Sequence, residues 1–198
     1  MHVAFEGLIG SGKTVVATSV ANELGSDTIL ALERYESNPF FRHFYIDHAR
    51  WGLQIQLAFL LERLATLGPL SSAPKNVIAD YSFLKGMVFA RVVLNEAELA
   101  LYSAISQQLA PKYTQPDMIV YLEAPSDVLL DRIYSRGRPY EKSIDRQYLE
   151  ALRQSYEEEL ALLPKNRLLR LDATVVDPDD RMQMLALGHR VLHTPGLD

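Results

Sequence analysis

Short apolar runs alternate with longer segments of helical periodicity along this chain. Five runs have the length of strands, and most are continuously apolar rather than strictly alternating, which is typical of strands buried on both faces of a sheet. These predicted strands lie at 2–6, 28–33, 77–80, 118–124 and 168–173.

Six segments between the runs space their apolar residues as amphipathic helices do. They are expected at 12–24, 49–67, 95–110, 126–135, 145–161 and 179–192. Ser126 and Asp145 are candidate N-caps, Gly25 and Gly68 stand where C-terminal caps belong, and 68–76 is expected to be a loop. Strands that alternate with helices predict an α/β fold with a five-stranded parallel sheet flanked by helices. We expect a single domain over 1–198, since neither side of the 68–76 loop could close a core alone.

The composition narrows the class of protein. The 198 residues include no cysteine, which excludes disulfides and thiolate chemistry. The net charge of -5 argues against a long nucleic-acid footprint but leaves a small phosphorylated ligand open. No apolar stretch approaches the roughly 20 residues of a membrane span, and the run at 2–5 is too short for a secretory signal. We expect a cytoplasmic protein that binds neither membranes nor nucleic acid.

The segment GLIGSGKT at 7–14 matches the phosphate-loop pattern G-x-x-x-x-G-K-[ST]. A predicted strand precedes it and a predicted helix follows it, a context that favours a phosphate loop over an ordinary glycine-rich turn. Backbone N–H groups would face phosphate oxygens at the positive end of the helix, while Lys13 reaches the terminal phosphates and Thr14 offers a hydroxyl to Mg²⁺. The predicted ATP-binding residues are Gly7, Leu8, Ile9, Gly10, Ser11, Gly12, Lys13 and Thr14.

The loop alone leaves the reaction open, because GTPases, ATPases and small-molecule kinases share it. Further motifs follow in order: Glu33 at the end of the second predicted strand, NPFFRHFYID at 38–47, WGLQIQLAFLLER at 51–63, DYS at 80–82 and RIYSRGRPYE at 132–141. With these motifs, the chain resembles the deoxynucleoside kinases of the deoxycytidine and deoxyguanosine kinase type over nearly its whole length. The resemblance implies the phosphate-loop NTPase fold and transfer of the γ-phosphate of ATP to the 5'-hydroxyl of a deoxynucleoside. It also implies a homodimer, with the helix at 49–67 near the interface.

Two carboxylates are expected at the carboxyl ends of strands, where open α/β sheets bind their ligands. The resemblance makes Glu33 the base that accepts the proton of the 5'-hydroxyl. A solvated glutamate, or an ion pair with Arg34, is the alternative. Asp80 would hold Mg²⁺ together with Thr14, or else cap the segment that follows it.

The resemblance makes the arginine-rich segment that begins RIYSRGR a lid, over about 132–144. Arg132 and Arg136 share a helix face, and Gly137 would end the helix so that Arg138 folds over the site. With Lys13 and Glu33 these arginines form the predicted catalytic set, because charge on the transferred phosphoryl group must be neutralised. The alternative is an exposed basic helix end favoured by its dipole.

The resemblance places Tyr45 and Glu141 at the 3'-hydroxyl and Gln56 on the base. The Gln56 amide both donates and accepts, so it recognises a base without choosing one; a packed or solvated glutamine is the alternative. Trp51 and Phe83 are candidate walls of the base pocket, or else simply core aromatics.

Two charges that most relatives carry are missing. Tyr81 stands where they have an arginine, and Gly86 where they have an aspartate. Arg34 or a lid arginine would then contact the 5'-hydroxyl and the phosphates in place of the missing arginine. Asp80 and Tyr81 are still expected to belong to the substrate site. Relatives use the aspartate to accept from the amino group of cytosine or adenine. Without this aspartate, Lys85 would make the site a hydrogen-bond donor rather than an acceptor, which suits O6 and N7 of guanine. The alternative is that Lys85 points to solvent.

The sequence therefore predicts a purine deoxynucleoside kinase that uses ATP and Mg²⁺ and converts deoxyguanosine to dGMP. Three features resemble the bacterial deoxyguanosine kinase branch most. They are DYS at 80–82, the lysine three residues later, and RGRPYEK in the lid. A deoxyadenosine or deoxycytidine kinase is the nearest alternative, and a nucleoside monophosphate kinase such as thymidylate kinase is a more distant one. The chain lacks the N-K-x-D motif expected of a GTP-dependent switch protein.

Overall fold

The computed structural model describes residues 1–70, 75–113 and 115–193. Its five strands form one sheet in which all neighbours run parallel, in the order β2-β3-β1-β4-β5. The strands are β1 (His2–Gly7), β2 (Thr28–Ala31), β3 (Asn76–Ala79), β4 (Met118–Glu123) and β5 (Leu168–Asp172). The five predicted strands are confirmed, and every residue of β1 is buried, as expected for a strand covered on both faces.

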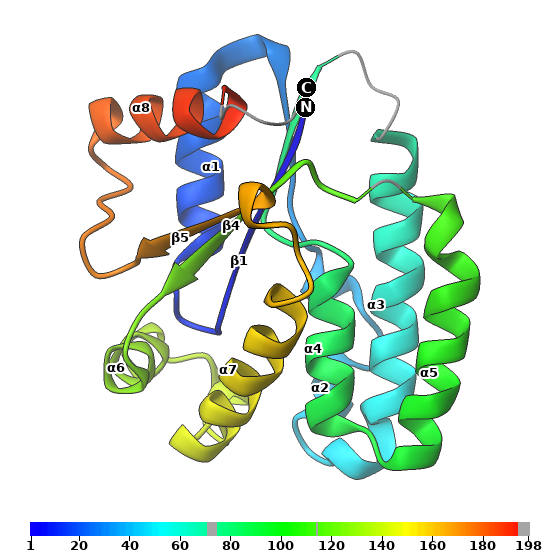
Figure 1. Ribbon diagram of the computed structural model, residues 1–198. Coiled ribbons are helices and arrows are strands. Elements are labelled where there is room, and N and C mark those ends of the chain that lie inside the picture. Colours follow the sequence, from blue (N-terminus) through cyan, green and yellow to red (C-terminus); the bar gives the residue numbers. More distant parts are fainter. Residues whose placement is uncertain (71–74, 114, 194–198) are drawn as a thin grey trace.

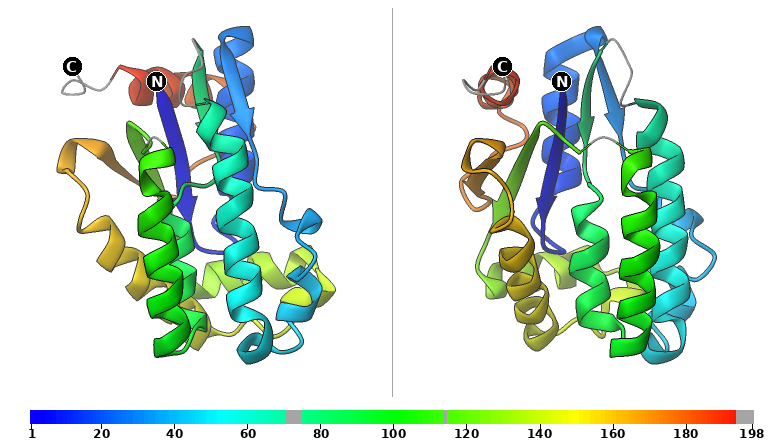
Figure 2. Two further views of the ribbon diagram at one scale, coloured as in Figure 1. Left: turned by 90° about the vertical axis from the view of Figure 1, so that its right-hand side faces the viewer. Right: turned by 45° about the vertical axis from the view of Figure 1, so that its right-hand side comes forward.

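Helices cover both faces of this sheet (Figures 1 and 2). α1 and α8 pack together on one face, whereas α4 and α7 pack together on the other, with α3 and α5 beside α4. The helices are α1 (Lys13–Leu24), α2 (Phe41–Phe44), α3 (His48–Leu70), α4 (Leu84–Val93), α5 (Glu96–Leu109), α6 (Ser126–Arg136), α7 (Arg146–Leu160) and α8 (Arg181–Leu192).

The predicted helix ends are correct in part. Gly25 is the C-cap of α1, and the Asp145 side chain accepts from the N–H of Tyr148 as the N-cap of α7. Ser126 is instead the first residue of α6, and its hydroxyl donates to Glu150. Gly68 is not a cap either, because α3 continues to Leu70. The predicted loop at 68–76 therefore begins inside α3 and ends in β3, and its part at 71–74 lies outside the described residues.

The apolar pattern does not predict α4, although this helix brings two site residues together. Its buried residues include Leu84, Gly86, Val88 and Ala90, which do not form one narrow apolar stripe. The reason is its position between α3 and α5 on one side and α7 on the other, so that more than one face is covered. A short helix that is apolar on several faces and contains a glycine is hard to distinguish from a loop by periodicity.

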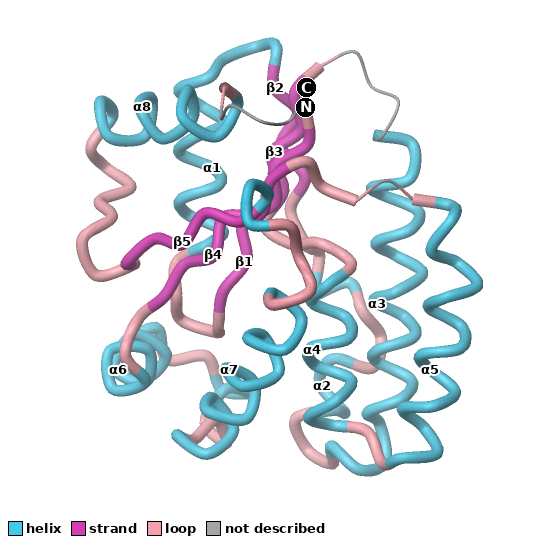
Figure 3. The backbone as a smooth tube through the Cα atoms, viewed as in Figure 1, coloured by secondary structure: helices cyan, strands magenta, loops and turns pink. Residues whose placement is uncertain are grey.

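The segments that follow β1, β2 and β3 leave the sheet at its carboxyl edge, where α6 also lies (Figures 1 and 3). In a parallel sheet this edge brings residues distant in sequence into one site. In the described part of the chain, no helix has the length and apolarity needed to cross a membrane.

Candidate active site

The phosphate loop joins β1 to α1 and depends on two glycines. Gly7 and Gly10 have φ of +151° and +86°. A Cβ atom on Gly7 would lie 2.7 Å from the Leu122 carbonyl oxygen, and one on Gly10 would lie 2.8 Å from the Leu129 carbonyl oxygen. Because these neighbours are backbone atoms of β4 and α6, larger residues would push the loop out of place.

The loop ends at the N-terminus of α1, where Gly12 is the N-cap and Lys13 the first helical residue. The Lys13 Nζ donates to the carbonyl oxygen of Leu8 at 3.4 Å. Burial and the repulsion of Lys85 lower the pKa of Lys13 to about 8. An anion in the loop would relieve both effects, as expected of a phosphate site.

Asp80 follows β3 directly and joins the phosphate loop to the segment after β2. Its Oδ2 accepts from the Thr14 hydroxyl at 2.5 Å, and its Oδ1 accepts from the backbone N–H of Glu33 at 2.7 Å. The carboxylate thus contacts the segment after β2 as well as the phosphate loop, and it does not cap α4.

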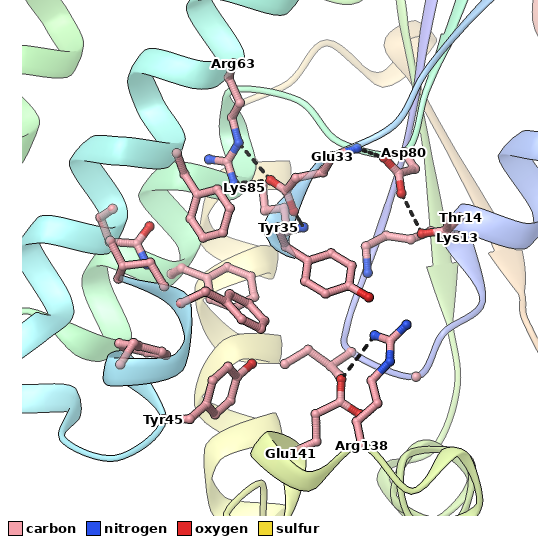
Figure 4. A pocket seen from close by; sticks show the side chains of 18 of the residues that line it. Lys13, Thr14, Glu33, Tyr35, Tyr45, Arg63, Asp80, Lys85, Arg138 and Glu141 are labelled. Carbon is pink, nitrogen blue, oxygen red and sulfur yellow. Dashed lines mark hydrogen bonds and ion pairs between the residues drawn. The ribbon is translucent and has the colours of Figure 1, made fainter. Parts of the chain in front are cut away.

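Glu33 lies two residues beyond the end of β2 and is buried between two cations (Figure 4). Its Oε1 accepts from Nε and Nη2 of Arg63 at 3.0 and 2.5 Å, and Lys85 Nζ contacts Oε2. Burial raises the pKa of Glu33, but the charges of Lys85 and Arg63 outweigh it and lower the pKa to about 2. The carboxylate is therefore ionised at neutral pH.

Arg63 is the site residue that the sequence reasoning missed. It is the arginine that pairs with Glu33, in place of Arg34, which was the alternative considered for that ion pair and is exposed. The signal was available: Arg63 follows Gln56 by seven residues, two helical turns, so both lie on one face of α3. Its third nitrogen, Nη1, is buried without a hydrogen-bond partner.

Glu33, Lys85 and Arg63 belong to the wall of one cavity, and most of the predicted site residues join them there. Gln56 is 3% exposed, and its Oε1 has no hydrogen-bond partner. The predicted residues in this wall are Ile9, Gly10, Lys13, Thr14, Glu33, Tyr45, Gln56, Asp80, Lys85, Arg136, Arg138 and Glu141.

The aromatic walls of the cavity differ from the predicted ones. Phe41, Phe44, Phe59 and Phe89 line it, together with Tyr35 and Tyr45. Trp51 instead stacks on Phe40, and Phe83 stacks on Tyr113, which agrees with the alternative reading of both as packing residues.

Tyr81 does not reach the cavity, contrary to its expected place in the substrate site. It is 2% exposed and packs in the apolar cluster of α3, α4 and α5. The reason is local: Asp80 faces the phosphate loop, and the next side chain leaves the backbone on the other side.

In the segment predicted to be a lid, α6 ends at Arg136 and Gly137 follows with φ of +66°, so the expected helix end is confirmed. Arg136 donates to both oxygens of Glu141, from Nη2 at 2.8 and 2.7 Å and from Nε at 3.1 Å, and Arg138 is a weaker partner at 3.4 Å. Burial and the charge of Glu141 raise the pKa of Tyr45, which therefore keeps its phenolic proton.

Arg132 lies apart from the other two arginines. It donates to the carbonyl oxygen of Ala173 at 2.9 Å and to that of Gly10 at 3.5 Å, and it does not line the cavity. Arg132 therefore joins the phosphate loop to the segment after β5.

Gly86 faces Arg63 and α5 rather than open space. A Cβ atom at this position would overlap the Tyr102 hydroxyl oxygen and lie 2.9 Å from Nη1 of Arg63. Tyr102 is fully buried, and its hydroxyl has no hydrogen-bond partner. The tyrosine thus fills the space that a side chain on residue 86 would need.

A deoxynucleoside kinase family model matches residues 3–186 of this chain. The chain belongs to the deoxynucleoside kinase family. It is 37% identical over 159 residues to deoxyguanosine kinase of Bacillus subtilis (strain 168), covering 78% of this chain and 76% of that protein. It is 28% identical over 163 residues to the deoxyadenosine/deoxycytidine kinase of the same organism, covering 78% of this chain and 74% of that protein.

Among solved structures, this deoxynucleoside kinase resembles deoxyadenosine kinase from M. mycoides with products dCMP and a flexible dCDP bound. The TM-score is 0.83 at 23% identity, with 97% of this chain and 99% of that chain covered. The predicted phosphate-loop NTPase fold is confirmed, as is the predicted membership of a phosphotransferase family.

Proposed function

We propose that this deoxynucleoside kinase transfers the γ-phosphate of ATP to the 5'-hydroxyl of a purine deoxynucleoside, with deoxyguanosine preferred and dGMP and ADP as products. The observation that supports this base preference is that residue 86 is a glycine and lies beside Nη1 of Arg63, which has no hydrogen-bond partner. No carboxylate at this position accepts from an amino group, and the two nearest polar groups, the Tyr102 hydroxyl and Nη1 of Arg63, can both donate. Guanine presents acceptors, O6 and N7, where adenine presents an amino group at C6.

We thus propose Arg63 as the donor to the base, in place of Lys85, which the sequence suggested for this role. Lys85 does not point to solvent, and its ammonium is engaged by Glu33. Gln56 completes the proposed base contacts, since its free Oε1 accepts from a base N–H. The similarity to a deoxyguanosine kinase supports the same preference.

The acceptor sugar is proposed to lie between Glu33 and Glu141. Glu33 takes the proton of the 5'-hydroxyl, while Tyr45 and Glu141 bind the 3'-hydroxyl. Arg136 and Arg138, with Lys13, neutralise the transferred phosphoryl group. Arg132 acts at the phosphate-loop side of the donor, where its two carbonyl contacts hold it.

Mg²⁺ is proposed to bind at Thr14 and Asp80. A hydroxyl 2.5 Å from a carboxylate oxygen at the end of the phosphate loop suits an ion that takes most of its ligands from nucleotide phosphates and water. In the described residues no group of three or more His, Cys, Asp or Glu side chains forms a metal cage, and this mode of binding needs none. When bound, the ion would neutralise charge on the phosphates of ATP.

A cytoplasmic homodimer is proposed as the working form, with α3 near the interface. α3 and α5 lie together on one side of the molecule, and they expose Leu61 and Leu101 to 58% and 50%. Light scattering of the wild type and of Leu61→Glu checks this proposal, and we expect the variant to shift toward the monomer.

The test of the proposed reaction is phosphate transfer from labelled ATP to each of the four deoxynucleosides, with dGMP and dTMP in parallel. We expect the highest kcat/KM for deoxyguanosine and no transfer to the monophosphates. Preference for deoxyadenosine would favour the alternative that the second Bacillus relative and the M. mycoides enzyme suggest. Transfer to monophosphates alone would overturn the proposed acceptor.

A further inference from the structure

Lys85 is the second residue of α4, and its ammonium group is held inside the cavity. The side chain is 12% exposed, and Nζ lies 5.8 Å from the centre of the Phe89 ring. Nζ contacts Oε2 of Glu33 in the same cavity wall as Lys13 and Thr14 (Figure 4). This lysine is therefore placed between the carboxylate and the phosphate loop.

The two oxygens of Glu33 have different partners. Oε1 already accepts two N–H groups from Arg63, whereas Oε2 has Lys85 beside it. We therefore expect a substrate hydroxyl that gives its proton to Glu33 to approach Oε2, the oxygen with fewer partners. The reacting oxygen would then lie next to Lys85 Nζ as well.

The cavity wall carries more positive than negative side chains, so Lys85 is available to bind an anion. Arg63 by itself neutralises Glu33, and the ammonium groups of Lys85 and Lys13 repel each other across the cavity. Five cationic and three anionic side chains line this cavity. A phosphoryl group between the two lysines would compensate the surplus positive charge.

We propose that Lys85 is a catalytic residue, whose ammonium group holds Oε2 of Glu33 and donates to the 5'-oxygen and to the phosphoryl group in transit. This assignment rests on the proposed function. The 5'-oxygen forms a bond to the γ-phosphorus, and the bond from that phosphorus to the β,γ-bridging oxygen breaks, so that its electron pair leaves with ADP. The proton of the hydroxyl passes to Oε2 of Glu33, and Lys85 keeps its own protons throughout.

Two lysines would then divide the task. Lys13 acts from the phosphate loop, on the side of the leaving ADP, and Lys85 acts from α4, on the side of the nucleoside. The opposing reading is that Lys85 reads the base. If Lys85 contacts the base, its loss should change the preference between deoxyguanosine and deoxyadenosine. If it contacts the phosphoryl group, which is common to all substrates, its loss should leave that preference unchanged.

The experiment compares Lys85→Met, Lys85→Gln and Lys85→Arg with the wild type, and it uses Lys165→Met at an exposed position far from the cavity as the matched control. We expect kcat to fall by about 10²–10³ for Lys85→Met and Lys85→Gln, as for other groups that stabilise charge in a transition state. The loss should be the same factor for deoxyguanosine and deoxyadenosine. Lys85→Arg should recover at least about tenfold over Lys85→Met, because it restores the charge, and Lys165→Met should behave as the wild type.

A second measurement separates catalysis from folding. Thermal stabilisation by deoxyguanosine alone shows that a variant folds and binds its acceptor. Affinity for ADP with aluminium fluoride and deoxyguanosine, a mimic of the phosphoryl group in transit, should fall in Lys85→Met, while affinity for ADP alone stays unchanged. Near-normal kcat in a folded variant, or a changed ratio between the two purines, would overturn the role of Lys85. A wild type that phosphorylates no deoxynucleoside would overturn the proposed function and this assignment with it.

Discussion

The hydroxyl of Tyr102 occupies the space that a side chain on Gly86 would need. A Cβ atom there would overlap this oxygen, and the next atom of the tyrosine, Cζ, would lie at an ordinary 3.6 Å. The glycine of α4 and the tyrosine of α5 are therefore two halves of one packing arrangement, and a change at one position limits what the other can be.

Gly86→Ala tests this arrangement through stability. We expect a cost of about 1–3 kcal/mol from overpacking against the Tyr102 hydroxyl. In a Tyr102→Phe background the overlapping atom is gone, so the same substitution should cost less. Urea denaturation of the two single variants and the double variant gives the coupling, expected at about 0.5–3 kcal/mol. Additive effects would show that the two positions do not share this space.

Gly86→Asp tests the base preference and needs the same background. In the single variant the new side chain overlaps Tyr102, so we expect turnover to fall for every nucleoside. In Gly86→Asp with Tyr102→Phe, the overlap with the hydroxyl is gone, and a small shift of Arg63 Nη1 from its 2.9 Å contact lets the carboxylate pair with that free nitrogen, while Nε and Nη2 keep their bonds to Glu33. We expect the ranking of kcat/KM to move toward deoxyadenosine or deoxycytidine. An unchanged ranking in the double variant would place the specificity site elsewhere.

The donor half of the site was predictable because it is local in sequence. Gly7, Lys13 and Thr14 follow one strand and open one helix, so a short pattern describes them. The acceptor half was only partly predictable, because Glu33, Arg63 and Lys85 come from three segments that meet through the packing of α3 against α4. The sequence indicated that a positive charge had been lost at Tyr81, but not that a buried arginine of α3 provides one.

Glu33→Gln tests the proposed base. We expect turnover to fall at least about a hundredfold, in the range of a positioned general base. We also expect the protein to lose about 3 kcal/mol or more, because Arg63 and Lys85 would keep buried charges without a counter-ion. Turnover should therefore be measured well below the melting temperature. Glu36→Gln, at an exposed neighbouring position, is the control, and near-normal turnover of Glu33→Gln would remove this residue from the mechanism.

The stability that Glu33 provides should depend on pH. Its pKa in the folded protein is about 2, below the usual 4.5, so the ionised carboxylate stabilises the fold fully above about pH 5. As the pH falls toward 2, the folded state gains a proton less readily than the unfolded state, and this stabilisation is lost. Denaturant unfolding at pH 7, 5, 4 and 3 should show the advantage of the wild type over Glu33→Gln shrinking below about pH 5. A constant difference across this range would contradict the lowered pKa.

Asp80→Asn tests the proposed Mg²⁺ site. The amide oxygen can still accept from the Glu33 N–H, and the amide NH₂ can donate to the Thr14 hydroxyl, so both contacts can be kept while the negative charge is lost. We expect a higher Mg²⁺ concentration for half-maximal rate and a fall in kcat, because a neutral amide binds hard cations more weakly than a carboxylate. Titration of the rate with Mg²⁺ checks this, with Thr14→Ser as the control that keeps the hydroxyl. Equal Mg²⁺ dependence of Asp80→Asn and wild type would exclude Asp80 as a ligand.

Arg136 and Glu141 should act as a unit, because the guanidinium holds both oxygens of a carboxylate that is only 4% exposed. Arg136→Ala would leave this buried charge without its main partner, so we expect a higher KM for the nucleoside as well as a lower kcat. Arg136→Lys should restore little, since an ammonium group cannot make the paired contact. In Glu141→Gln the added substitution Arg136→Ala should raise KM much less than it does in the wild type, because the charge that Arg136 balances is gone. Independent effects on KM would show instead that Arg136 meets the phosphates alone and that Glu141 binds the sugar without its help.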